Sequence, residues 1–301
     1  MNLWIPDRAD RDAMGELPEQ VALNLIPGEG EPPKAILDAE LLVPGSENPG
    51  VLELLGGMSR LRVIQTLSAG VDWLPPIPSG VTLCDARGTR DIAVAEWVLA
   101  AILASTRRLG ELRDLQRGHE WQWCTSGELA GSRVMILGYG SIGVAVEARL
   151  AALEVNLIRV ARHARAGVHS VDDLRSLLGL ADIVVVLLPL TPDTRGLLDR
   201  DLLACLRPGA LLVNAARGAI VDSDALLELL QAGRVRAALD VTDPEPLPAD
   251  HPLWDAPGTL ITPHFAGDTV AAERRAFALV GDQVRRYVQG EPLVNTVENG
   301  Y

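Results

Sequence analysis

The residues Arg133-Val-Met-Ile-Leu137 come directly before Gly138-Tyr-Gly-Ser-Ile-Gly143, and this junction is the strongest indication of a fold class in the chain. The apolar run is typical of a buried strand, and the pattern that follows from Val144 to Leu153 is typical of a helix. A GxGxxG pattern is weak alone, but between a strand and a helix it has the context of a phosphate-binding turn. Gly138 permits the tight turn, Gly140 lets the backbone approach phosphate, and Gly143 permits close helix–strand packing. The sequence therefore predicts a dinucleotide-binding βα unit here.

The alternation of strand-like and helical patterns continues toward the C-terminus. Five more buried, strand-like runs follow, at residues 155–161, 182–189, 210–216, 236–241 and 259–263. Helical patterns separate most of them, at residues 171–178, 201–206 and 223–232. Six strands alternating with helices predict a doubly wound parallel sheet, the dinucleotide-binding architecture.

The first part of the chain predicts a second, smaller domain. Short apolar runs divided by Gly/Pro turns fill residues 2–87, which is typical of a small parallel α/β fold. Long helical patterns follow at 91–108 and, near the C-terminus, at 271–289. We expect a flavodoxin-like substrate domain of residues 1–95 and 271–301, with a Rossmann domain of residues 96–270 inserted into it. Residues 110–131 read as an excursion, either a loop or a dimer arm.

Composition excludes several classes of function. The net charge of −13 argues against binding to nucleic acid or to an anionic membrane, so an anionic substrate needs a local cationic site. Lys34 is the single lysine, which argues against Schiff-base chemistry. The three scattered cysteines fit reduced thiols in a cytoplasm, and the N-terminus has no signal-peptide pattern. No HxxH, HExxH or carboxylate cluster predicts a metal site.

The residues after the second strand of the large domain bear on the choice of dinucleotide. An acid at this point would bind the ribose 2′-hydroxyl of NAD, but Ala161 stands there. Three cationic or titratable side chains follow, Arg162, His163 and Arg165, and such a cluster attracts a 2′-phosphate. The sequence favours NADP over NAD. The alternative, a solvated strand end in an arginine-rich chain that binds NAD, stays open.

Three further candidates each follow a strand: Arg217 in VNAARG, Glu245 in LDVTDPEPLP and His264 in LITPHFAG. A histidine can donate a proton to a developing alkoxide, and a carboxylate beside it can orient the ring and stabilise imidazolium. An arginine offers a planar fork to a carboxylate. Together the three side chains could protonate an alkoxide and hold a carboxylate.

Seven ordered motifs give the chain a strong resemblance to the D-isomer-specific 2-hydroxyacid dehydrogenases, in particular the glyoxylate and hydroxypyruvate reductases. They are LSAGVD (67–72), VAEW (94–97), GYGSIG (138–143), LPLTPDTRGLL (188–198), VNAARGAIVD (213–222), LDVTDPEPLP (239–248) and ITPHFAG (261–267). The resemblance implies that His264, paired with Glu245, is the proton donor and that Arg217 binds the substrate carboxylate and carbonyl. The backbone of Ser68, Ala69 and Gly70 is implied to hold that carboxylate from the other side. Reaction between the two domains, with water excluded by their closure, is also implied.

The same resemblance assigns the cofactor contacts. Beside the glycines and the cationic cluster, these are Ser141, Ile142, Pro189, Thr194, Ala215, Asp240 at the nicotinamide carboxamide, and Gly267. It also implies a cytoplasmic homodimer that pairs through the cofactor domain, with residues 110–131 as the arm.

Other readings within and outside the family stay open. Glu245 argues against the formate dehydrogenases, which carry glutamine opposite the histidine, and the absence of lysine from residues 68–70 argues against phosphite oxidation. An end at Tyr301 is expected for a chain without the C-terminal regulatory domain of many phosphoglycerate dehydrogenases. Outside the enzymes, a nucleotide-sensing scaffold of the corepressor type or a binding module without turnover remains an alternative.

Overall fold

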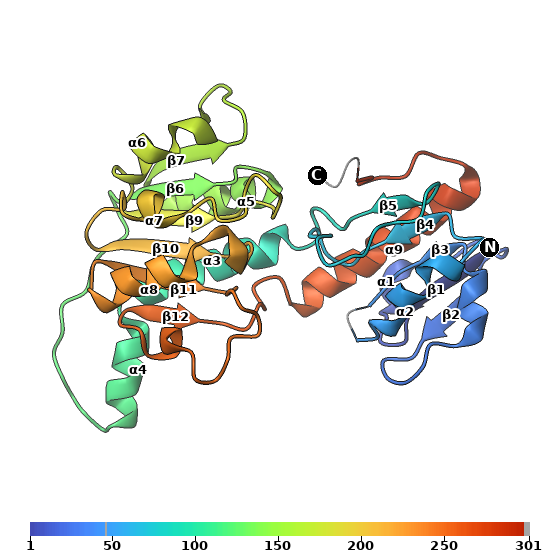
Figure 1. Cartoon of the computed structure of the whole chain (residues 1–301), viewed down its shortest axis with the longest axis horizontal. Helices are drawn as coiled ribbons and strands as arrows, with labels where there is room; N and C mark the ends of the chain where they lie inside the picture. Colours follow the sequence, from blue (N-terminus) through green and yellow to red (C-terminus); the bar gives the residue numbers. More distant parts are fainter. Residues whose placement is uncertain (46, 298–301) are drawn as a thin grey trace. The chain divides into compact units, whose positions relative to one another are not determined.

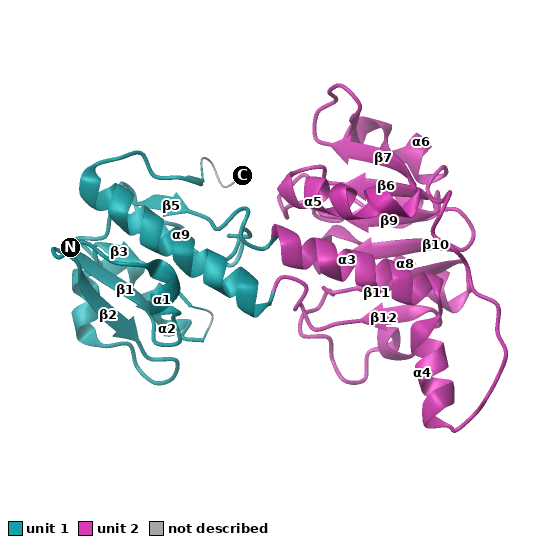
Figure 2. Cartoon of the chain, turned by 180° about the vertical axis from the view of Figure 1, so that it is seen from behind, with its two compact units in different colours: residues 1–90, 268–301 teal, residues 91–267 magenta. Residues whose placement is uncertain are grey.

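The computed structural model describes residues 1–45 and 47–297 and divides the chain into two compact units. Unit 1 comprises residues 1–90 and 268–301, and unit 2 comprises residues 91–267 (Figure 2). The chain therefore leaves unit 1 once and returns to it once. The crossings lie a few residues before those expected at 95–96 and 270–271. Each crossing precedes a long helix, so α3 (Asp91–Thr106) belongs wholly to unit 2 and α9 (Val270–Gln289) wholly to unit 1.

Unit 1 is built on a five-stranded parallel sheet in the order β2-β1-β3-β4-β5, which is the flavodoxin-like order (Figure 1). Its strands are β1 (Asn2–Pro6), β2 (Ala22–Ile26), β3 (Leu41–Leu42), β4 (Val63–Gln65) and β5 (Thr82–Cys84). Its helices are α1 (Arg11–Met14), α2 (Gly50–Glu53) and α9. Thr296 bridges Cys84 in antiparallel fashion, so the C-terminal segment covers the β5 edge.

Two apolar layers sandwich the sheet of unit 1. On one face Leu3, Ile5 and Val63 pack against Met14 of α1 and Phe277 of α9. On the other face, alternate strand residues pack against α2 and two short 3₁₀ segments; these strand residues are Trp4, Leu42 and Ile64. Burial raises the pKa of the Cys84 thiol to about 11, which makes it unreactive.

Unit 2 is a seven-stranded parallel sheet in the order β12-β11-β10-β9-β6-β7-β8. Its strands are β6 (Arg133–Leu137), β7 (Asn156–Ala161), β8 (His169–Ser170), β9 (Ile183–Val186), β10 (Ala210–Asn214), β11 (Val235–Leu239) and β12 (Thr259–Ile261). Its helices are α3, α4 (Leu109–Arg117), α5 (Ser141–Leu150), α6 (Leu174–Leu178), α7 (Arg200–Leu203) and α8 (Ser223–Gln231). This confirms the predicted fold class, two doubly wound parallel sheets with the Rossmann fold in the larger unit.

Successive residues of each strand face opposite sides of the sheet, and they form the two hydrophobic cores of unit 2. Val134 and Ile136 of β6 face the layer that contains α3 and α5. Met135 and Leu137 face the opposite layer, which contains α6, α7 and α8. Helix α3 fits this position because apolar residues occupy most of its circumference, so it can pack on the sheet and on α5 together.

Two elements were not predicted as such. Strand β8 has two residues, which is too short to leave a period-two pattern. The segment read as a loop or arm begins with helix α4, and none of the nine residues of α4 is buried. Leu109, Leu112 and Leu115 have helical spacing, but a nine-residue segment that contains Gly110 is a weak helical pattern.

The contact between α1 and α9 depends on Gly281. A Cβ atom at this position would stand 2.0 Å from the carbonyl oxygen of Met14. We expect Gly281→Ala to lower the free energy of unfolding by about 1–3 kcal/mol, because the two helices must separate. Gly110→Ala is the control, since nothing lies within 4 Å of its Cβ, and it should be neutral or stabilising by up to about 1 kcal/mol. Urea unfolding followed by circular dichroism measures both, and equal midpoints would contradict the close contact.

Candidate functional site

The glycine loop between β6 and α5 forms a cradle. Gly138 has φ +107°, and a Cβ there would lie 2.6 Å from the carbonyl carbon of Leu187. At Gly143 a Cβ would lie 3.0 Å from the carbonyl oxygen of Gly138. At Gly140, by contrast, a Cβ would meet nothing within 4 Å. Two glycines therefore permit close packing, and the middle one leaves open space beside the backbone.

The N-terminus of α5 lies at that open space. Gly140 is the N-cap, with extended backbone, and no side chain of the described residues caps the helix there. Ser141 and Ile142 begin the helix, so its first amides and its positive dipole end face the cradle. A pyrophosphate fits this arrangement, and these residues are the ones that would hold it.

The loop after β7 lies beside the glycine loop, because β6 and β7 are neighbouring parallel strands. Arg162, His163 and Arg165 are all exposed there, and Ala161 occupies the position where an NAD-type acid would stand. Arg162 forms an ion pair with Asp193 at 3.1 Å, whereas an Nη2 of Arg165 donates to the carbonyl oxygen of Tyr139 at 2.8 Å.

The other residues assigned to the cofactor also follow strands of unit 2. Pro189 and Thr194 lie in the loop after β9, where the Thr194 hydroxyl donates to the Pro189 carbonyl at 2.7 Å. Ala215 follows β10, Asp240 follows β11, and Gly267 ends the unit. All of these loops leave the carboxyl edge of one parallel sheet, which is where ligands bind in such folds.

Arg217, Glu245 and His264 follow the adjacent strands β10, β11 and β12. The structure brings the last two together, with Nδ1 of His264 2.5 Å from Oε1 of Glu245. Both side chains are about two-fifths exposed, at 45% and 39%. Because this contact uses Nδ1, the other ring nitrogen of His264, Nε2, is the one that can face a reacting group. The exposure of the ring allows such a group to reach it. One guanidinium nitrogen of Arg217 donates to the carbonyl oxygen of Ala216 at 2.8 Å.

A buried carboxylate, Asp240, holds the loop that contains His264. Its Oδ1 accepts from the Thr262 hydroxyl at 2.6 Å and from the Phe265 amide at 3.0 Å, and its Oδ2 accepts from the Ala266 amide at 2.9 Å. Its carbonyl oxygen accepts from the His264 amide at 2.7 Å. These bonds offset the left-handed backbone of His264 at φ +53°, which is unfavourable for a side chain with a Cβ. The family resemblance implied a nicotinamide contact for Asp240, and this network was not predicted.

The turn Ser68–Gly70 lies in unit 1, directly after β4. Three carbonyl oxygens in and just before this turn accept hydrogen bonds within the unit: Leu67 O from Arg90 Nε (3.3 Å), Ser68 O from Thr66 Oγ1 (2.7 Å) and Gly70 O from Trp73 Nε1 (3.0 Å). In a trans peptide the C=O and the next N–H point in opposite directions. The amides of Ser68, Ala69 and Val71, which follow these carbonyls, therefore point away from the groups that bind the carbonyls.

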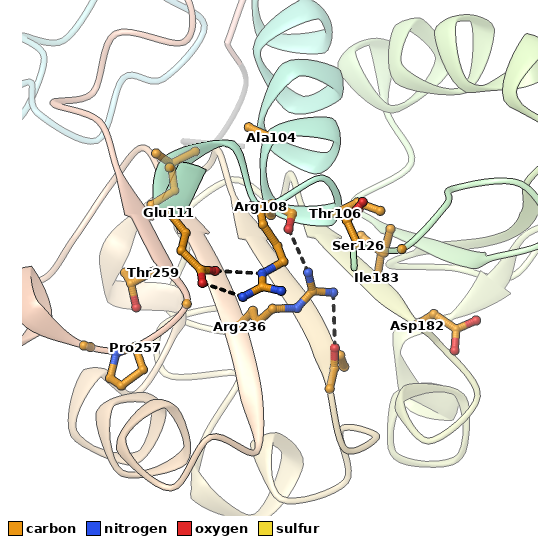
Figure 3. A pocket seen from close by; sticks show the side chains of 18 of the residues that line it. Ala104, Thr106, Arg108, Glu111, Ser126, Asp182, Ile183, Arg236, Pro257 and Thr259 are labelled. Atoms are coloured by element: carbon orange, nitrogen blue, oxygen red, sulfur yellow. Dashed lines mark hydrogen bonds and ion pairs between the residues drawn. The ribbon is translucent and has the colours of Figure 1, made fainter. Parts of the chain in front are cut away.

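Unit 2 also has a hollow of about 900 Å³ that sequence reasoning did not predict (Figure 3). It lies at the amino edge of the sheet, opposite to the edge described above, since Asp182, Gly209 and Thr259 at strand starts line it. Arg236 is partly buried in its wall, and its guanidinium donates to the carbonyl oxygens of Ser105 at 3.0 Å and Gly209 at 3.4 Å.

Two negative findings apply to residues 1–45 and 47–297. No group of three or more His, Cys, Asp or Glu side chains there is placed to hold a metal ion. No helix in this part of the chain is long and apolar enough to cross a bilayer.

Comparison with known proteins relates the chain to one family of dehydrogenases. Residues 99–266 match the family model for the NAD-binding domain of D-isomer specific 2-hydroxyacid dehydrogenases. A D-3-phosphoglycerate dehydrogenase of Mycobacterium leprae is 34% identical over 97% of this chain, which spans only 58% of that protein. A glyoxylate reductase of Thermofilum pendens is 34% identical over 79% of this chain and 75% of its own length.

A solved structure extends the likeness to the whole chain. It is an NADPH-dependent glyoxylate/hydroxypyruvate reductase from Sinorhizobium meliloti in complex with NADP and sulfate. Its TM-score is 0.83 at 28% identity, with 100% of this chain and 99% of that one covered.

The Asp240 network predicts a large effect of a small change. In Asp240→Asn an amide NH₂ replaces one acceptor oxygen, so at least one buried donor of the loop loses its partner. We expect the free energy of unfolding to fall by about 1–3 kcal/mol. Asp193→Asn is the matched control on an exposed side chain and should change it by less than about 0.5 kcal/mol. Equal urea midpoints for the two variants would show that the carboxylate does not hold the loop.

Proposed function

The chain belongs to the D-isomer-specific 2-hydroxyacid dehydrogenase family, and we propose that it reduces a short 2-oxo acid to a D-2-hydroxy acid. The observation that supports this proposal best is the 2.5 Å contact between His264 and Glu245, at the sheet edge where the glycine loop also lies. When bound at that loop, a reduced nicotinamide dinucleotide supplies the hydride.

His264 acts as the proton donor. Hydride addition to the carbonyl carbon leaves negative charge on the carbonyl oxygen, which takes a proton from Nε2 of the imidazolium. Glu245 accepts the hydrogen bond from Nδ1, so it fixes the ring orientation and stabilises its charged form. Asp240 positions His264 through the loop backbone and also provides the proposed carboxamide contact, since one of about four carboxylate lone pairs remains.

Arg217 and the turn Ser68–Gly70 bind the substrate carboxylate. The planar guanidinium of Arg217 matches a carboxylate and polarises the adjacent carbonyl oxygen. The turn adds backbone amides, whose orientation follows from the carbonyl contacts described above. Short substrates such as glyoxylate and hydroxypyruvate fit the proposal, and the glyoxylate reductase among the relatives supports it.

NADPH is the preferred reductant in this proposal, with NADH the weaker alternative. The support is the lack of an acid at Ala161 and the cluster Arg162, His163 and Arg165 beside the glycine loop. The solved reductase that is similar over the whole chain is NADPH-dependent. In a chain of net charge −13, a doubly charged 2′-phosphate needs such a local cluster.

A cytoplasmic homodimer completes the proposal. Trp121 and Trp123 follow α4 and are 97% and 92% exposed, on a segment whose helix buries none of its residues. Burial of each indole would contribute roughly 4–6 kcal/mol before association costs. Residues 125–128 of the same segment line the hollow in Figure 3, so the exposed indoles and the hollow can belong to one patch, which a two-fold interface would use on both subunits.

The test of the activity is His264→Gln. We expect kcat for 2-oxo acid reduction to fall by about 10²–10⁴-fold, because general acid catalysis is lost, while NADPH binding changes little. His169→Gln, an exposed histidine of β8, is the matched control and should retain full activity. A corepressor-type sensor gives the opposite result: no 2-oxo acid is turned over by the wild-type chain, although NADPH binds.

The test of the dimer is the double variant Trp121→Ser/Trp123→Ser. We expect sedimentation equilibrium to report the mass of two chains for the wild type and of one chain for the variant, because the exposed indoles supply the contact. Val270→Ser removes an exposed apolar side chain of unit 1 and should leave the dimer intact. A wild-type chain that is monomeric at micromolar concentration would refute this part of the proposal.

A further inference from the structure

Four side chains form a connected cluster beside the glycine loop: Tyr139, Glu147, Arg159 and Arg165. The Tyr139 hydroxyl donates to Oε2 of Glu147 at 2.5 Å, and Arg159 binds both oxygens of that carboxylate at 2.6 and 2.7 Å. Arg159 and Arg165 each place their guanidinium carbon 5.8 Å from the centre of the Tyr139 ring. A tyrosine in the second position of the glycine motif is therefore in contact with two cations.

Both carboxylate oxygens of Glu147 accept hydrogen bonds within this cluster. Hydrogen bonding from Arg159 lowers the pKa of Glu147, and the bond to Glu147 raises the pKa of the Tyr139 phenol. Glu147 is thus ionised and paired, and Tyr139 is neutral with its ring held at one end. The phenol is bonded to Glu147 of α5, which Arg159 of β7 holds in turn. The Tyr139 ring is therefore held in one orientation next to the loop.

Arg165 differs from the other two arginines of this region. Arg159 is bound to Glu147, and Arg162 is paired with Asp193. Among the described residues, Arg165 has no carboxylate partner, although it is held in place at two points. Its Nη2 donates to the Tyr139 carbonyl at 2.8 Å, and its guanidinium lies near the Tyr139 ring. A cation without a counter-ion is thereby fixed beside the glycine loop.

We propose that Tyr139 determines the preference for NADP by positioning Arg165 to bind the 2′-phosphate. The idea rests on the proposed function, and it adds a residue outside the cationic loop itself. An exposed arginine has many rotamers, and ordering one on binding is unfavourable. Contact with the ring and the carbonyl of Tyr139 orders Arg165 before the cofactor binds. Binding of the 2′-phosphate then loses less side-chain entropy, so its affinity is higher.

Equilibrium binding tests this role without turnover. NADPH and NADH would be titrated by their fluorescence, and adenosine 2′,5′-bisphosphate and 5′-AMP by calorimetry, against the wild-type chain and its variants. Tyr139→Leu removes the ring and keeps the backbone carbonyl, and we expect two- to fivefold weaker binding of the two 2′-phosphate ligands. Binding of NADH and 5′-AMP should change by less than twofold. Tyr139→Phe keeps the ring, so its affinity for the two 2′-phosphate ligands should lie between those of the wild type and Tyr139→Leu.

The arginine variants locate the effect. Arg165→Ala should weaken binding of the bisphosphate at least tenfold, because a charge-assisted hydrogen bond is lost. Arg162→Ala is the matched control in the same loop and should have a smaller effect, since its guanidinium is already paired. Tyr139→Leu/Arg165→Ala should bind no more weakly than Arg165→Ala alone, because Tyr139 acts only through Arg165.

Two results would overturn the inference while leaving the cofactor preference standing. One is equal weakening of NADPH and NADH by Tyr139→Leu, which would make Tyr139 a support of the glycine loop only. The other is additivity of the two substitutions in the double variant. If instead the wild-type chain binds NADH as tightly as NADPH and Arg165→Ala changes neither, the NADP proposal itself fails.

Discussion

All seven strands of unit 2 run in one direction, so every loop that follows a strand leaves the same edge of the sheet. This constraint places the glycine loop after β6, the cationic loop after β7 and the Glu245–His264 pair after β11 and β12 on one side. Proximity alone does not fix geometry, and here the buried carboxylate of Asp240 does so. It accepts hydrogen bonds from the Thr262 hydroxyl before His264 and from the Phe265 and Ala266 amides after it.

The two ends of this sheet have different chemistry. The carboxyl edge has the open cradle at Gly140 and a set of arginines that compensates locally for a chain of net charge −13. The amino edge has the hollow with Arg236 in its wall, next to the segment with Trp121 and Trp123. The proposed ligand site and the proposed dimer contact therefore lie at opposite ends of the sheet.

Much of this arrangement could be predicted from the sequence, for physical reasons. The motif at Gly138–Gly143 has one geometry because its glycines tolerate contacts that a Cβ would forbid, and the buried strands leave continuous apolar runs. What could not be predicted depends on contacts that no spacing encodes. Asp240 accepts bonds from residues more than twenty positions away, and the contact between Arg165 and Tyr139 joins two loops. Helix α4 has only nine residues, one of them Gly110, so its helical pattern was weak although Leu109, Leu112 and Leu115 share one face.

Hydride transfer to a 2-oxo acid is the step on which the proposed function depends, and transfer of an isotope label tests it. The wild-type chain would be incubated with NADPH deuterated at the transferring C4 position and, separately, with glyoxylate, hydroxypyruvate, pyruvate, phenylpyruvate or 2-oxoisocaproate. Mass spectrometry and chiral chromatography of the products would follow. We expect a 2-hydroxy acid with one deuterium on C2 from at least one of these acids, and the D configuration for any product longer than glycolate. Absence of labelled hydroxy acid from all five, with NADPH bound to the protein, would contradict it.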